Sequence, residues 1–118
     1  MLFIEYPKCT TCQKAKKWLD EHNVTYTDRH IVENNPSYDE LKEWHEKSAL
    51  PLKKFFNTSG LLYKELQLKD KLPTMSEEEQ LQLLATNGML VKRPLLVDGE
   101  TVLTGFREAE WAEKIGIV

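Results

Sequence analysis

Hydrophobic positions at the start of the chain change from a continuous run to helical spacing. Residues 2–6 form a short, mostly apolar run that stops at Pro7, which is typical of a buried strand. Over residues 10–22, apolar positions recur on one face while charged side chains occupy the other, which predicts an amphipathic helix. The β-branched and aromatic run 24–27 follows the turn-prone Asn23 and predicts a second strand. This segment is therefore expected to form a β-α-β unit.

The middle of the chain has helical patterning with clear start signals. Ser37 and Ser76 are each followed three positions later by a glutamate, the pattern of a capping box, so helices are expected from 37 to about 47 and from 76 to a stop at Asn87–Gly88. Between them, short helical segments are expected, separated by Gly60 and Pro73. We expect this helical section to cover about residues 37–90.

A hairpin and a last helix are predicted at the end of the chain. The runs 95–97 and 101–103 flank Asp98–Gly99, a signal for a tight turn between antiparallel strands. Residues 108–114 have amphipathic spacing and are followed by Gly116, a typical helix stop. The order β-α-β, helices, β-β-α predicts an α/β thioredoxin-like fold around a mixed sheet, with a helical insertion, in one domain over residues 1–118.

The composition of the chain argues against two classes of partner, nucleic acids and membranes. The 118 residues carry a formal net charge of −3, so there is no broad basic surface for direct nucleic-acid binding. No apolar stretch has the length of a membrane span, and residues 1–6 do not have the form of a signal peptide. We expect a protein of the cytoplasm that does not associate with membranes.

The two cysteines, Cys9 and Cys12, are the candidate reactive groups. Cys9 falls at the entrance of the first predicted helix, where unpaired backbone N–H groups and the helix dipole stabilise a thiolate, and Lys8 adds positive potential. Cys12 follows one helical turn later and can attack a disulfide formed at Cys9. The sequence therefore predicts Cys9 as the nucleophile, Cys12 as the resolving thiol, and a redox disulfide between them.

Two other interpretations of the cysteines are less favoured. Cysteine also serves as a small apolar filler, but the helix-entrance position of Cys9 points to reactivity. A structural zinc needs further ligands, and His22, His30 and His45 lack the spacing of small zinc sites. We expect no metal and no bound cofactor.

Four motifs occur together and in order along the chain. They are Tyr6-Pro7-Lys8-Cys9-Thr10-Thr11-Cys12, Phe55-Phe56-Asn57, Arg93-Pro94 and Gly105-Phe106-Arg107. With them the chain resembles the ArsC family, including its Spx/MgsR branch, over nearly all of its length. The resemblance implies a thioredoxin-like domain with a helical insertion, and it implies a cis-proline beside the reactive cysteine, at Pro94.

The resemblance also implies an anion site. In family members that reduce arsenate with glutathione and glutaredoxin, one cysteine attacks the oxyanion and three arginines hold it, since guanidinium groups match tetrahedral anions. Arg93 and Arg107 match two of these arginines, whereas Asn57 stands at the first and supplies no charge. The second cysteine, Cys12, is instead similar to the Spx/MgsR arrangement.

Two functions follow as hypotheses. The first is a thiol oxidoreductase acting on a disulfide or an oxyanion, recycled by glutathione and glutaredoxin, thioredoxin or another low-molecular-weight thiol. The second is a redox-switched regulator that binds RNA polymerase, through its alpha subunit, as the Spx/MgsR branch implies. The segments 57–68 and 105–107 look closer to arsenate reductases, which favours the first hypothesis.

Overall fold

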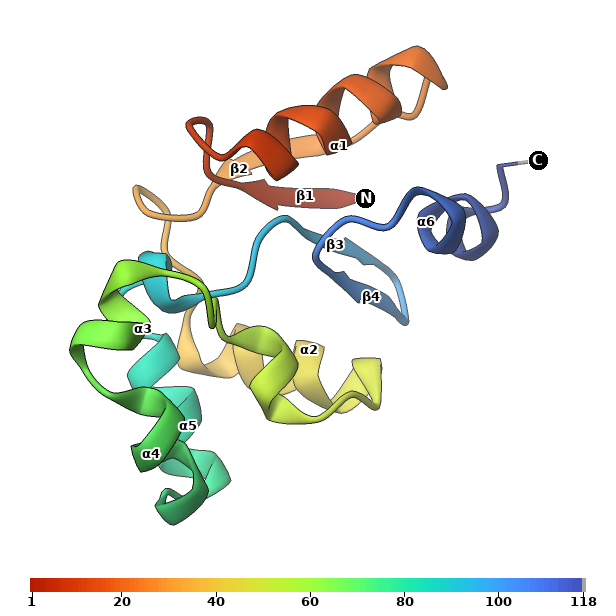
Figure 1. The fold of residues 1–118 in the computed structure, drawn as a ribbon. Coiled ribbons are helices and arrows are strands. Elements are labelled where there is room, and N and C mark those ends of the chain that lie inside the picture. The colour runs from red at the N-terminus through yellow and green to blue at the C-terminus, as the bar shows by residue number, and fades with distance from the viewer. Residues whose placement is uncertain (118) are drawn as a thin grey trace.

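A four-stranded mixed sheet forms the centre of the computed structural model, which describes residues 1–117. The strands are β1 (Leu2–Glu5), β2 (Thr27–His30), β3 (Leu95–Asp98) and β4 (Thr101–Thr104), in the order β2-β1-β3-β4 (Figure 1). β2 runs parallel to β1, while β3 and β4 are antiparallel additions. The reactive segment thus follows directly from a central strand.

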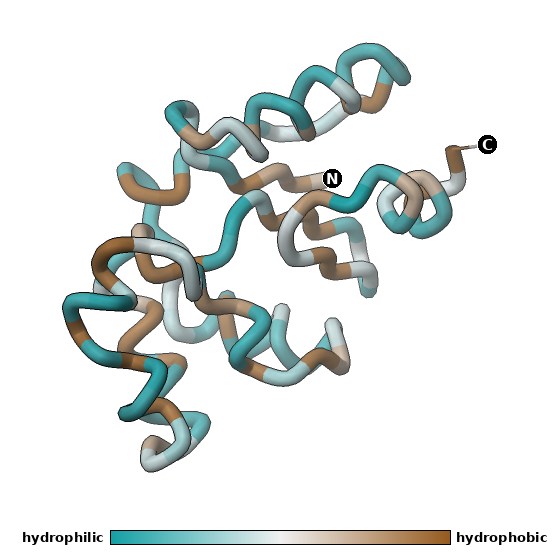
Figure 2. Tube along the Cα trace, viewed as in Figure 1, coloured by the Kyte–Doolittle hydropathy of each residue, from teal (hydrophilic) through white to brown (hydrophobic). Residues whose placement is uncertain are grey.

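Helices cover both faces of the central strands, whose alternate residues point to opposite sides of the sheet. On one face, Phe3 and its neighbours on β3 and β4 pack against α1 (Thr10–Glu21) and α6 (Glu108–Ile115). On the other, Ile4 and Leu95 belong to a second apolar cluster with Trp44 of α2 (Tyr38–Ser48). Figure 2 shows hydrophobic residues concentrated along the central strands and hydrophilic ones over much of α1. The expected thioredoxin-like α/β fold is confirmed.

The expected helical insertion lies between β2 and β3, at one end of the sheet (Figure 1). After α2 it consists of short elements: η1 (Leu52–Phe55), α3 (Leu61–Glu65), α4 (Leu68–Lys71), η2 (Leu72–Thr74), α5 (Glu77–Leu84) and η3 (Gly88–Leu90). Ser37 and Ser76 form the predicted capping boxes, since each hydroxyl accepts from the backbone N–H of the glutamate three positions on. Gly60 caps α3 as a boundary residue, whereas Pro73 lies inside η2.

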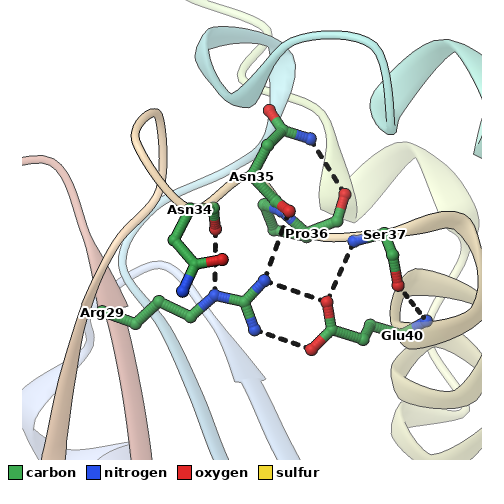
Figure 3. A network of polar contacts seen from close by, with 6 residues as sticks. All are labelled: Arg29, Asn34, Asn35, Pro36, Ser37 and Glu40. Atoms are coloured by element: carbon green, nitrogen blue, oxygen red, sulfur yellow. Dashed lines mark hydrogen bonds and ion pairs between the residues drawn. The ribbon is translucent and has the colours of Figure 1, made fainter.

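Arg29 attaches the insertion to the sheet (Figure 3). From β2 its guanidinium forms a bidentate pair with Glu40 of α2, at 2.6 and 2.9 Å, and donates to the carbonyl of Asn34 at 2.9 Å. It also lies 5.9 Å from the ring centre of Trp44. A single side chain therefore fixes the β2–α2 connection and the start of α2.

Two expected strand boundaries are wrong by a few residues. The second strand was expected over 24–27, but Asn23 takes a left-handed conformation (φ +55°) and the N–H of Val24 closes the helix end on Leu19, so pairing with β1 begins only at Thr27. The hairpin turn is Gly99–Glu100 rather than Asp98–Gly99, because Asp98 pairs with Thr101. β2 is largely polar, which is why its position is not visible in the apolar pattern.

The helix expected to stop at Asn87–Gly88 ends earlier, at Leu84. Gly88 instead starts η3, and a Cβ there would lie 2.1 Å from the carbonyl oxygen of Ile31. This glycine is required by close backbone packing. None of the helices in residues 1–117 has the length and apolar character of a membrane span.

Candidate active site

Cys9 occupies the turn between β1 and α1. Its backbone N–H donates to the carbonyl of Tyr6 at 2.9 Å, and its own carbonyl accepts from Gln13 at 3.0 Å, which makes Cys9 the N-cap of α1. The Gln13 side chain donates to the carbonyl of Pro7 at 2.9 Å. The turn is thereby tied to the first turn of the helix, and the Cys9 thiol is held at the helix entrance in a partly exposed position.

Cys12 lies one helical turn further on and is completely buried, with an exposed fraction of 0%. Both cysteines are free thiols in this structure. The structure therefore places the two sulfur atoms at the same end of α1 but in different surroundings, one open to a reactant and one shielded from it.

The two thiols differ in pKa. Burial raises the pKa of Cys9, but the backbone N–H groups of Cys12 and Thr11, the Cys12 thiol and the Arg93 guanidinium outweigh it, so its pKa is lowered. Burial is the largest effect on Cys12 and raises its pKa to about 12. The Tyr6 backbone N–H opposes it, and the neighbouring Cys9 and the negative charge of Glu5 reinforce it. Cys9 is the better nucleophile near neutral pH, since the thiolate is the reactive form.

Arg93 and Pro94 lie beside Cys9, in the segment before β3. The Arg93–Pro94 peptide bond is cis. The Arg93 guanidinium stands 5.2 Å from the ring centre of Tyr6, donates to the carbonyl of Met89 at 3.2 Å and helps to stabilise the Cys9 thiolate. The structure thus brings Cys9, Cys12, Arg93 and the adjoining Pro94 into one site.

Asn57 stands where the resemblance implies a first arginine, and it offers no charge. Its backbone N–H donates to Leu90 at 2.8 Å, next to an isolated bridge between Phe56 and Val91. The side chain is only 9% exposed and packs near Gly60, where a Cβ would meet its amide nitrogen at 2.6 Å. The segment 55–57 therefore runs beside the chain that leads to Arg93, but it adds no cation.

Arg107 is exposed and is the N-cap of α6. Two residues earlier, the N–H of Gly105 donates to the carbonyl of Pro94 at 2.8 Å, so the β4–α6 loop contacts the cis-proline. Within residues 1–117, no hydrogen bond or ion pair joins the Arg107 side chain to Cys9 or Arg93. Its predicted role in anion binding stays a prediction.

Sequence reasoning missed a group of charged residues where β1, β2 and α1 meet, close to the cysteine turn. Glu5, at the end of β1, is only 4% exposed and lies 3.5 Å from Nζ of Lys16 on α1. Nζ of Lys16 also pairs with Asp28 of β2 at 2.7 Å. Burial and the neighbouring Asp28 raise the pKa of Glu5 to about 7, against a lowering effect of Lys16. The available signal was a glutamate at the end of an otherwise apolar strand, four residues before Cys9.

The site offers thiol chemistry and anion recognition. No cluster of three or more metal-ligating side chains occurs in the part of the chain that the structure describes. What the geometry provides is a thiolate, a second thiol one turn away, a guanidinium, and a buried carboxyl group that titrates near neutral pH.

Comparison with curated proteins finds relatives over almost the whole chain. The chain is 59% identical to YusI of Bacillus subtilis strain 168, covering 96% of each chain. It is 31% identical to the regulatory protein MgsR of the same strain, covering 93% of this chain and 86% of MgsR. It is 30% identical to the global transcriptional regulator Spx of Staphylococcus aureus strain Mu50, covering 88% of this chain and 78% of Spx.

Solved structures agree with this relationship. An ArsC family related protein from Bacteroides fragilis superposes with a TM-score of 0.93 at 63% identity, covering 95% of this chain and 94% of the other. A structure described as a possible arsenate reductase from Streptococcus mutans gives a TM-score of 0.88 at 46% identity, covering 96% of each chain. The model of the ArsC family matches residues 4–114. With the cysteine turn, the cis-proline and the helical insertion in place, the chain belongs to the ArsC family.

Proposed function

We propose that this protein is a thiol–disulfide oxidoreductase of the cytoplasm, in which Cys9 is the nucleophile and Cys12 the resolving thiol. The observation that carries the proposal is the asymmetry of the pair: a partly exposed thiol of lowered pKa beside a fully buried thiol with a pKa of about 12. An exposed thiolate can enter a reaction, and a shielded thiol can complete it.

The reaction has two steps. In the first, the Cys9 thiolate attacks a substrate disulfide; one sulfur of the substrate leaves as a thiolate, and Cys9 becomes part of a mixed disulfide. In the second, Cys12 loses its proton and attacks Cys9, which releases the other substrate sulfur and forms the Cys9–Cys12 disulfide. The substrate gains two electrons, and glutathione with glutaredoxin, thioredoxin or another low-molecular-weight thiol would return them to the protein.

An oxyanion is the less favoured substrate. Arg93 is the one guanidinium that the described structure places against Cys9, while Asn57 contributes no charge and Arg107 stays exposed at the start of α6. Tetrahedral anions are held best by several guanidinium donors around one point. Arsenate reduction would therefore have to proceed with fewer guanidinium groups around the anion.

Similarity to MgsR and Spx, at 31% and 30% identity, favours one second candidate. In that function the Cys9–Cys12 disulfide would switch a surface that binds RNA polymerase, through its alpha subunit. The same cysteine chemistry would serve as a sensor and not as a turnover site. The two functions therefore differ in the captured molecule and in the bond to it. An oxidoreductase holds its substrate as a mixed disulfide, whereas a regulator holds RNA polymerase without a covalent bond.

The test is a trapping experiment with tagged Cys12→Ser protein expressed in cells. Without the resolving thiol, Cys9 is expected to stay bound to its substrates as mixed disulfides, which elute only with a reductant. The matched control is Cys9→Ser, which should capture none of these species. If no species requires a reductant for release, and salt releases RNA polymerase subunits with the same yield from wild type and Cys9→Ser, the result would contradict the oxidoreductase and support the regulator.

A further inference from the structure

Glu5 is an acid in a position where acids are rarely found. It is the last residue of the central strand β1 and is 4% exposed, and within residues 1–117 its Oε2 atom is buried without a hydrogen-bond partner. Nζ of Lys16 stands 3.5 Å away but bonds to Asp28 at 2.7 Å instead. A buried carboxylate oxygen with a 3.5 Å ion pair but no hydrogen bond is only partly compensated, which favours the protonated acid.

The neighbour that could use it is Cys12. Cys12 and Lys16 are four residues apart on α1 and therefore lie on one face of the helix. The ion pair between Lys16 and Glu5 shows that this face of α1 lies over the end of β1. Among the smaller causes of the raised pKa of Cys12 is the negative charge of Glu5, which places the carboxylate within electrostatic range of this thiol. Cys12 is fully buried, so bulk water has no direct access to its proton.

The other groups facing Glu5 set its proton affinity. Lys16, from α1, favours the carboxylate. Asp28, from β2, favours the protonated form, and His30 of the same strand is the register partner of Glu5. Burial is the largest effect and acts in the same direction as Asp28. The resulting pKa of about 7 leaves Glu5 able both to accept and to give a proton at neutral pH.

We propose that Glu5 accepts the proton of Cys12 during the resolving step and returns it when the Cys9–Cys12 disulfide is reduced. This inference rests on the proposed oxidoreductase function. In the forward direction the Cys12 S–H proton moves to the Glu5 carboxylate while the Cys12 sulfur bonds to Cys9, and the bond from Cys9 to the substrate sulfur breaks. In the reverse direction a reducing thiol attacks Cys9, and protonated Glu5 protonates the departing Cys12 sulfur.

The experiment separates the two steps with an aromatic disulfide reagent, dithio-bis-nitrobenzoate. Attack by Cys9 releases one coloured thiolate, and resolution by Cys12 releases a second, so stopped-flow absorbance shows two phases. The aromatic thiolate needs no proton to leave, and the second phase therefore reports removal of the Cys12 proton. In the wild type its rate should rise with pH around the pKa of Glu5, about 7.

In Glu5→Gln, the second phase should slow by at least about tenfold at neutral pH, since general base catalysis contributes about 100-fold or more. The dependence of its rate on pH should also lose the midpoint near the pKa of Glu5. The first phase, which belongs to Cys9, should change by less than about twofold, showing that the site is intact. Lys16→Met should move the midpoint of the second phase upward, because Lys16 lowers the pKa of Glu5. Glu21→Gln, an exposed carboxylate on the same helix, is the matched control and should leave both phases unchanged.

The outcomes distinguish this inference from the function on which it rests. A second phase in Glu5→Gln with the rate and pH profile of the wild type would overturn the role of Glu5 while leaving Cys12 as the resolving thiol. Release of a single thiolate by the wild type, as expected for Cys12→Ser, would instead overturn the proposed function itself.

Discussion

At the scale of single residues, one helical turn is enough to give two cysteines opposite properties. Cys9 stands outside the helix, where the N–H groups of the first turn have no carbonyl partners and stabilise its charge. Cys12 stands inside that turn and is fully buried, so its charge would lack solvation. The difference in reactivity between the two thiols therefore comes from their positions along one helix.

Arg93 is expected to lower the pKa of the Cys9 thiol. Its guanidinium is one of the groups that lower the pKa of the Cys9 thiol, so Arg93→Met should raise that pKa by roughly one pH unit or less. The measurement is the pH dependence of iodoacetamide labelling of Cys9, followed by mass spectrometry. Lys64→Met, which removes an exposed lysine of α3, should leave the labelling profile unchanged, and an equal shift in both variants would contradict the role of Arg93.

The cysteine pair could be predicted from the sequence because its chemistry is local: a strand, a turn and a helix start occur within a few residues. Arg93 and Pro94 were accessible only through the family resemblance, since more than eighty residues separate them from Cys9. Glu5 was not predicted at all. Its burial depends on α1 and on Asp28 of β2, and no local pattern of residues contains that arrangement.

At the scale of elements, helix starts were predictable and strand positions less so. Ser37 and Ser76 each carry their capping partner three positions away, so the signal and the structure coincide. The edge strand β2 has a polar sequence and is placed by its register with β1, which begins at the pair Leu2–Thr27. That register is a property of two strands together, and the pattern of one strand does not determine it.

The Arg29–Glu40 pair should make the attachment of the insertion sensitive to acid. Hydrogen bonds from Arg29 lower the pKa of Glu40 to about 2, against burial and with help from Ser37. A carboxyl group whose pKa is lower in the folded than in the unfolded chain stabilises the fold above its ordinary pKa, 4.5, and this contribution is lost as pH falls toward 2.

Glu40→Gln is therefore expected to lower the free energy of unfolding by about 1 kcal/mol at neutral pH, a value discounted because the side chain is 36% exposed. The glutamine retains the shape of the capping side chain, and the difference from wild type should shrink as pH falls through about 3. Urea unfolding at several pH values measures this. Glu43→Gln, in an exposed pair with Lys47 on the same helix, should cost less than about 0.5 kcal/mol; an equal cost would contradict a special role for Glu40.

At the scale of the whole molecule, the sheet is closed by helices on both faces, and the reactive turn lies at an end of its central strand. The last residues of that strand, Ile4 and Glu5, are buried. Glu5 has this position, and a carboxylate there is stabilised less well than in water. The fold should lose stability when Glu5 ionises.

This cost can be measured as a dependence of global stability on pH. Since the pKa of Glu5 is raised from 4.5 to about 7, the folded chain binds more protons than the unfolded chain between these values. The stabilising contribution of protonated Glu5 is full below pH 4.5 and is lost as pH rises through about 7. Glu5→Gln stays neutral throughout, so its free energy of unfolding should gain on that of the wild type as pH increases.

The gain is expected to reach about 1–3 kcal/mol near pH 8, from urea unfolding of reduced wild type and Glu5→Gln under identical conditions. The titration of Cys9 is common to both proteins and cancels in the difference. Glu33→Gln, which changes an exposed glutamate, should track the wild type at every pH. A wild type to Glu5→Gln difference that does not vary with pH would mean that Glu5 keeps an ordinary pKa. A growing difference would show that the fold tolerates a destabilising acid at the end of β1, beside the reactive turn, the kind of trade between stability and activity that functional sites impose.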